Sequence, residues 1–228
     1  MSYLIYAYTE TSGRYNSEHQ RHAIDNAVAR YYDPQPTREP FRTEQYSLAN
    51  LPQLETARCI LEPFTKRHLT DHYVSWLNDP DVVRYSEQRH KRHDLASCKA
   101  YMESFAGSPH YFIAITEKDQ NLGHIGNMNV YVDENNSAAD VGILLGHKQI
   151  WGHGYGVEVW NAVCRYLPLD LNLRKVTAGT SANNMGMRGI MHRSGMTDDG
   201  IRRRQLVMEG QEIDIIYGAL FRDSLLGH

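Results

Sequence analysis

The sequence lacks any long apolar run. Its uninterrupted hydrophobic stretches are only a handful of residues long, far short of the roughly 20 that a membrane-spanning helix needs. The N-terminal stretch MSYLIYAYTETSGRY has neither a basic lead nor a small-residue cleavage site, so we expect no signal peptide. These absences predict a protein that neither crosses nor binds a membrane.

The sequence also has no surplus of positive charge and few cysteines. Its net charge is −3 and it contains no wide basic stretch, which argues against a nucleic-acid partner. The three cysteines, Cys59, Cys98 and Cys164, are odd in number and far apart. This pattern favours free thiols in a reducing cytoplasm over a disulfide framework, so we expect a cytoplasmic protein.

The composition is that of a globular protein, with 41% hydrophobic and 22% charged residues in a chain of 228. A division near residue 55 separates an N-terminal appendage, residues 1–55, from one larger domain, residues 56–228. The appendage is expected to contain a strand over 2–9, an amphipathic helix and a proline-rich linker over 33–41.

Hydrophobic periodicity predicts the elements of the larger domain. Polar turns between its consecutive central strands favour an antiparallel meander, and the order β-α-α-β-β-β-α-β-α-β-β predicts an α+β domain with a mixed sheet. The expected strands cover 57–64, 110–117, 122–134, 137–146, 174–180, 201–208 and 212–221; the expected helices cover 70–80, 93–107, a run ending near 167, and 184–195.

The stretch HKQIWGHGYGVEVW, residues 147–160, places Gly152, Gly154 and Gly156 on alternate positions just before a helical run. Glycines at this spacing let backbone N–H groups approach an anion at a helix N-terminus. A Rossmann fingerprint requires a third glycine at position 157, which is Val, and a P-loop requires Gly-Lys-Ser/Thr, which is absent. Both nucleotide-binding motifs are therefore excluded.

Gln149-x-x-Gly152-x-Gly154 resembles the Q/R-x-x-G-x-G/A signature of the GNAT superfamily of acetyl-CoA-dependent N-acyltransferases. A second motif, Asn184 followed by Gly195-Met196, is similar to the family's Asn and Gly-Phe pair. The resemblance covers roughly residues 57–222 and is strongest to the branch of ribosomal-protein N-terminal and small-amine acetyltransferases. It implies the GNAT fold, a mixed, mostly antiparallel sheet flanked by helices and splayed between its fourth and fifth strands.

The resemblance implies that acetyl-CoA is the co-substrate, and it implies no metal. In the family, the glycine loop and the helix N-terminus hold the CoA pyrophosphate, and the end of the fourth strand binds the pantetheine. An alternative for Asn184 is that it caps the following helix, because Asn is a favoured N-cap. Carried over to this sequence, the cofactor-binding residues are Ile143, Leu144, Leu145, Gln149, Gly152, His153, Gly154, Tyr155, Gly156 and Asn184.

A base must remove a proton from an ammonium group before the amine can attack. Asp140 interrupts the apolar strand AADVGILLG where several family members carry a Glu, so it is the candidate, with a relaying water because Asp is the shorter side chain. The alternative is an Asp that is solvated or bonds a neighbouring loop. The family's thiolate-protonating Tyr is replaced by Met191, and the adjacent His192 is either the acid or a surface histidine.

The acyl acceptor is expected to be the primary amine of a small molecule, such as an amino sugar. The family points to Tyr85, Ser86 and Glu87, and strand alternation adds a polar face of Asn127, Asn129 and Tyr131, which could equally face solvent. The run 90–93, His-Lys-Arg-His, lacks the carboxylate or thiol spacing of a metal site and indicates a solvated turn.

Two other functions fit the same residues. One is a protein N-terminal α-amine acetyltransferase, and the other is a module that binds acyl-CoA without turnover. The resemblance also implies that the chain can form a homodimer.

Overall fold

The computed structural model describes residues 52–119 and 121–227. The strand, helix and linker expected before residue 52 lie outside the described residues. The first described strand, β1 (Leu54–Glu55), belongs by sequence to the expected appendage, yet it pairs with β2 at the edge of the main sheet.

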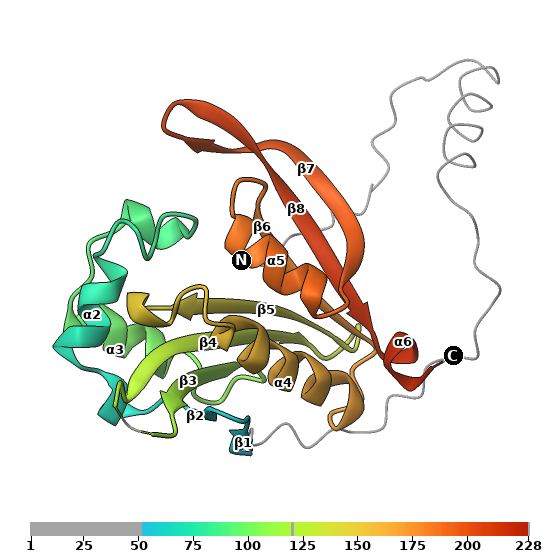
Figure 1. The fold of residues 1–228 in the computed structure, drawn as a ribbon, viewed down its shortest axis with the longest axis horizontal. Helices are drawn as coiled ribbons and strands as arrows, with labels where there is room; N and C mark the ends of the chain where they lie inside the picture. The colour runs from blue at the N-terminus through green and yellow to red at the C-terminus, as the bar shows by residue number, and fades with distance from the viewer. Residues whose placement is uncertain (1–51, 120, 228) are drawn as a thin grey trace, which may run out of the picture. The chain divides into compact units, whose positions relative to one another are not determined.

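The described residues form one sheet of eight strands in the order β1-β2-β3-β4-β5-β6-β8-β7. Every neighbouring pair is antiparallel except β5 and β6, which run parallel. Figure 1 shows β7 and β8 as a long hairpin that projects beyond the other strands. The remaining strands are β2 (Cys59–Pro63), β3 (Tyr111–Glu117), β4 (His124–Asp133), β5 (Ala138–Leu145), β6 (Lys175–Ser181), β7 (Thr197–Met208) and β8 (Gln211–Phe221).

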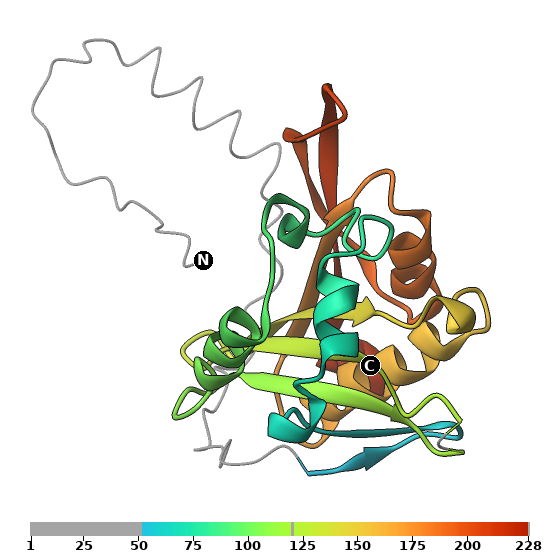
Figure 2. The ribbon, with the colours of Figure 1, turned by 90° about the vertical axis from the view of Figure 1, so that its left-hand side faces the viewer.

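Helices cover both faces of this sheet (Figures 1 and 2). One face packs against α4 (Tyr155–Leu169) and α5 (Met185–Arg193), and the other against α2 (Asp71–Leu77) and α3 (Leu95–Glu103). The predicted α+β class with a mixed, mostly antiparallel sheet is confirmed. The shorter helical elements are α6 (Arg222–Leu226) and three 3₁₀ turns, η1 (Lys66–His68), η2 (Glu87–His90) and η3 (Lys148–Ile150).

The alternation of β4 separates the core from the polar face. Met128, Val130 and Val132 are buried in the core cluster that includes Trp160 of α4. Their neighbours in sequence, 127, 129 and 131, therefore point to the face that carries α2 and α3. The structure therefore contains the polar face predicted for β4 and an apolar face opposite it.

The parallel pairing of β5 with β6 covers only three residue pairs, which end at Asp140 opposite Thr177. Beyond this point β5 continues to Leu145 against β4, and β6 continues to Ser181 against β8. The two strands therefore separate toward their C-terminal ends, as the family resemblance implies.

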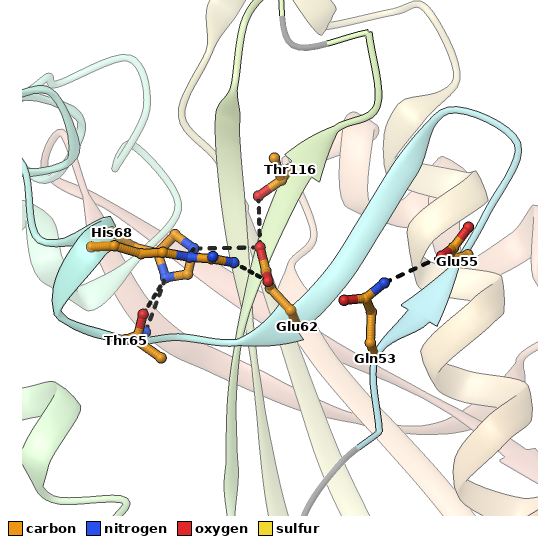
Figure 3. A network of polar contacts seen from close by, with 7 residues as sticks. Gln53, Glu55, Glu62, Thr65, His68 and Thr116 are labelled. Carbon is orange, nitrogen blue, oxygen red and sulfur yellow. Dashed lines mark hydrogen bonds and ion pairs between the residues drawn. The ribbon is translucent and has the colours of Figure 1, made fainter.

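A polar network at the edge of the sheet joins β2 and β3 to η1 (Figure 3). Thr65 donates its backbone N–H to Nδ1 of His68, and Thr116 donates its hydroxyl to Glu62, which lies beside His68. Next to this network, burial lowers the pKa of His124 to about 3. The His124 ring is therefore neutral near pH 7 and packs as an apolar ring 5.0 Å from that of Trp76.

Trp76 anchors α2 over the end of β5. A Cβ at Gly146 would lie only 1.8 Å from the Trp76 ring, so the indole rests directly on the Gly146 backbone. None of the helices in the described ranges is long and apolar enough to cross a membrane.

Gly146→Ala should destabilise the protein by about 1–3 kcal/mol, because the added methyl overpacks a rigid indole ring. The matched control is Gly189→Ala in α5, where the nearest atom to the new Cβ is the flexible end of Arg193 at 3.5 Å. The control should gain up to about 1 kcal/mol from helix propensity. Urea unfolding measures both, and a Gly146→Ala protein as stable as the parent would contradict the packing described.

Candidate active site

A cavity of about 870 Å³ occupies the gap where β5 and β6 separate. Its lining includes Gly142 to Leu145 of β5, the glycine loop, and the first residues of α4 and α5. It continues to the face of the sheet that carries α2 and α3, where Asn127 and Asn129 line it. One continuous space therefore joins the predicted cofactor residues to the predicted acceptor face.

The glycine loop presents unpaired donors to this cavity. Gly152 and Gly154 have φ angles of 78° and 83°, and Gly154 is the N-cap of α4. This left-handed conformation is strained for any residue with a Cβ. In the part of the chain that the structure describes, the N–H groups of Gly156 and Val157 have no hydrogen-bond acceptor. Free N–H groups at the start of a 15-residue helix form a site for an anion.

Arg58, at the start of β2, holds this loop in place. Its Nε donates to Glu158 of α4 at 2.7 Å, its Nη1 donates to the His153 carbonyl at 3.0 Å, and its guanidinium lies 3.9 Å from the centre of the Tyr155 ring. The Tyr155 hydroxyl in turn donates to Glu117 at 2.7 Å. These contacts tie the loop to the sheet without using its own N–H groups.

The free edge of β5 offers backbone groups to the cavity. Gly146 donates its N–H to Ile125 of β4, and alternation along an antiparallel pair then directs the backbone groups of Leu144 to β4 and those of Ile143 to the gap. The Leu145 carbonyl is already occupied, because the Trp151 indole donates to it at 2.9 Å. Ile143 is therefore the residue of this stretch whose N–H and C=O are placed for a ligand.

Asn184 has the capping role that its position allows. Its Oδ1 accepts the N–H of Met187, and its Nδ2 donates to the Thr180 hydroxyl, with both distances at 3.1 Å. Asn184 also lines the cavity. The cap and a contact with the cofactor can thus coexist.

The acceptor side of the cavity is polar and mostly uncharged. The Asn127 side chain is buried, and its Oδ1 has no donor among the described residues. Asn129 lies across Gly142, where a Cβ would come within 2.7 Å of its amide oxygen. Tyr101 lines the same wall and its hydroxyl lies 2.9 Å from that of Tyr131; burial raises the pKa of Tyr101, so its hydroxyl remains protonated.

Asp140 lies at the point where the strands separate. Thr177 donates its hydroxyl to Asp140 Oδ2 at 2.9 Å, and the carboxyl group is exposed. Asp140 is not among the residues that line the cavity, although Gly142, two residues further along the same face, is. Met191 is buried in the core, and His192 is exposed and lines no part of the cavity.

Some of the other predicted residues line the cavity and others do not. Tyr85 and Ser86 line the cavity, and Ser86 caps η2. Glu87, Gln149 and the side chains of His153, Tyr155 and Tyr131 do not line it. Glu87 instead forms an ion pair with Arg89 at 2.9 Å.

Several lining residues were not predicted from the sequence, among them Tyr73, Cys98, Tyr101 and Lys91. Cys98 and Tyr101 belong to the helix predicted over 93–107. No group of three or more potential metal ligands occurs within residues 52–119 and 121–227, and all three cysteines are free and buried.

A sheet split at its parallel pair, with a glycine loop that leads into a helix at the split, defines an acyltransferase that uses CoA thioesters. The model of the acetyltransferase (GNAT) domain matches residues 58–197. The chain therefore belongs to the GNAT acetyltransferase family and is an enzyme of that family. A search of curated protein sequences gives no significant match.

Solved structures of acetyltransferases share the fold at low identity. Spermidine N-acetyltransferase from Vibrio cholerae, in complex with CoA and spermine, is 14% identical with a TM-score of 0.66, covering 74% of this chain and 98% of its own. The ribosomal-protein-S5-alanine acetyltransferase from Vibrio fischeri is 16% identical with a TM-score of 0.60, covering 75% and 97%. RimL, a ribosomal L7/L12 α-N-protein acetyltransferase in complex with CoA, is 13% identical with a TM-score of 0.65, covering 73% and 95%.

Glu158→Gln should weaken the attachment of the loop in a pH-dependent way. Burial by itself would raise the pKa of Glu158, but hydrogen bonds from Thr56 and Arg58 outweigh it and lower the pKa. A carboxyl with a lowered pKa stabilises the fold above its unfolded-state pKa, and this contribution is lost as the pH falls through the folded-state pKa. We expect Glu158→Gln to lower the free energy of unfolding by about 1–2 kcal/mol at pH 7. This difference should become smaller below the ordinary pKa of Glu.

Urea unfolding between pH 7 and pH 3 measures this difference. The control is Glu103→Gln, whose ion pair with Lys99 is about half exposed on α3 and should contribute roughly 0.5 kcal/mol or less. A deficit in Glu158→Gln that stays constant over the whole pH range would show that the carboxylate charge has no part in holding the loop.

Proposed function

We propose that the protein transfers an acetyl group from acetyl-CoA to the primary amine of a small, polar molecule. The observation that supports this proposal best is the single cavity that joins the glycine loop and the free edge of β5 to the amide side chains on β4. Transfer between two substrates needs them to meet in one space with reacting atoms aligned.

Three features would hold acetyl-CoA. The N–H groups at the start of α4 suit its pyrophosphate, the backbone of Ile143 suits the pantetheine amides, and Asn184 lies at the far side of the gap. The bound thioester supplies the acyl group. The described residues fit such a ligand because the free donors and the gap already exist, with Gly154 accepting no side chain without strain.

The β4 face would bind the amine. A buried amide oxygen without a donor costs about 1–3 kcal/mol, so Asn127 Oδ1 gains from a donor on a bound substrate. Asn129 and the Tyr101 hydroxyl add further polar contacts on the same wall. Such a wall suits a hydroxyl-bearing amine, an amino sugar being one example.

Asp140 is our candidate for the base. Its carboxylate lies on the same face of β5 as Gly142, about 7 Å away by the rise of a strand, which is a distance one or two water molecules can bridge. Thr177 donates to Oδ2, and no other described residue donates to Oδ1, which could accept a proton from such a water.

Acetyl-CoA should raise the melting temperature of the parent protein, because a ligand that binds only the folded state stabilises it by mass action. Gly154→Val should abolish this shift, since a side chain there enters the space expected for the phosphates and strains a backbone at φ 83°. The control is Gly107→Val, which has a similar strain at φ 71°, open space around its Cβ and no place in the cavity. It should melt lower but keep the full shift. If acetyl-CoA raised the melting temperature of Gly154→Val as much as that of the parent, this would contradict the proposal that the glycine loop binds the pyrophosphate.

Release of the CoA thiol should depend on added amine, and Asp140→Asn should lower kcat/KM about 100-fold at pH 7, the usual size of a general-base effect. The loss should shrink as the pH rises, because more of the amine is then deprotonated in solution. Thr177→Val, which keeps the carboxylate, should retain most of the activity. Full activity of Asp140→Asn at pH 7 would make Asp140 a purely structural residue, and thiol release only with peptide N-termini would assign the protein-acetylating function.

A further inference from the structure

A second cavity, of about 440 Å³, lies beside the first. One side is the segment between α2 and α3, and the other is the tip of the β7–β8 hairpin, Val207 to Glu209. The two cavities share Leu77 and Lys91 in their linings. Leu77 and Lys91 therefore lie at the boundary between the two cavities.

The second cavity is strongly cationic. Four of its lining residues are Arg84, Arg89, Lys91 and Arg92, whereas Glu209 is the single carboxylate among the described residues that line it. Arg84 forms a loose ion pair with Glu209 at 3.4 Å, with both side chains more than half exposed. Lys91 and Arg92 have no carboxylate partner among the residues that the structure describes. No described carboxylate therefore compensates their charge.

Among the described residues, Asp81 is the one carboxylate that lines the main cavity. Lys148 pairs with Asp81 at 2.7 Å and with Asp79 at 2.8 Å. The basic residues of the lining, Lys91 and Arg193, outnumber it. A substrate with several positive charges would meet cations at the mouth of the cavity and no free carboxylate within it.

We propose that the acyl acceptor is an amine that also carries an anionic group, a phosphate or a carboxylate, which Lys91 and Arg92 bind where the two cavities meet. This inference rests on the proposed function and narrows its substrate. The amine lies against Asn127 and Asn129, and the anionic group lies at the opposite end of the acceptor half, so charge orients the molecule. The Lys91 and Arg92 side chains are both exposed, so added salt should weaken their attraction for an anion.

Two matched pairs of amines test the proposal with the full-length protein. Glucosamine and glucosamine 6-phosphate differ only in a phosphate, and the amide of γ-aminobutyric acid and the acid itself differ only in a carboxylate. The anionic member of at least one pair should have a kcat/KM roughly tenfold or more above its neutral partner, as expected for a charged hydrogen bond. The pair that shows the preference identifies the anionic group. Added salt should reduce this preference, and spermidine should react more slowly than either anionic amine.

The variant Lys91→Gln/Arg92→Gln should remove the preference, mainly by raising KM for the anionic amine, whereas kcat/KM for the neutral partner should fall much less. Lys99→Gln is the control, because it removes one exposed charge from α3 and lines neither cavity. Equal rates for both members of each pair in the parent, or an equal loss for both in the double variant, would overturn the proposal. If no amine reacts although acetyl-CoA still raises the melting temperature, the proposed function itself fails.

Discussion

The separation of β5 from β6 is the constraint on which the rest of the site depends. Only three residue pairs hold the two strands together, and Asp140 and Thr177 form the last of them. Past that point β5 still forms backbone hydrogen bonds with β4, and β6 still forms them with β8. The facing edges are left with backbone groups that must find other partners, since unpaired buried N–H and C=O groups are costly. A sheet that stayed closed here would have neither the cavity nor the donors that line it.

Glycine and arginine keep this gap open in different ways. Gly156 has no side chain where a Cβ would lie 2.8 Å from Ile190 and 3.2 Å from Leu145, so α4, α5 and β5 meet closely just below the cavity. Arg58 ties the other end of the loop to β2 through Glu158 and the His153 carbonyl. The loop is thereby held by side-chain contacts, and its N–H groups stay free for a ligand. Backbone recognition of this kind depends on geometry more than on side-chain identity.

The sequence predicted the elements whose pattern is local. The alternation of β4 and the Asn184 cap of α5 depend on neighbours within a few residues, and the structure contains both. The contacts that depend on distant segments were not predictable in this way. Arg58 and Glu158 are 100 positions apart, and Lys91 with Arg92, interpreted as part of a solvated turn, line a cavity only because the β7–β8 hairpin lies across from them. Elements as short as β1 and α6 have too few residues to show a period.

The fold of the family determines the cofactor half of the cavity more closely than the acceptor half. The cofactor half is built from backbone groups at the strand split and at the helix N-terminus, so the fold itself largely defines it. The acceptor half is built from side chains of β4, α3 and the α2–α3 segment, which can change charge without disturbing the sheet. Structures with this fold at 13–16% identity are named for spermidine and for ribosomal proteins, so the fold does not select one acceptor. We therefore expect selection to depend on the side chains that line the acceptor half, where Lys91 has no carboxylate partner among the described residues.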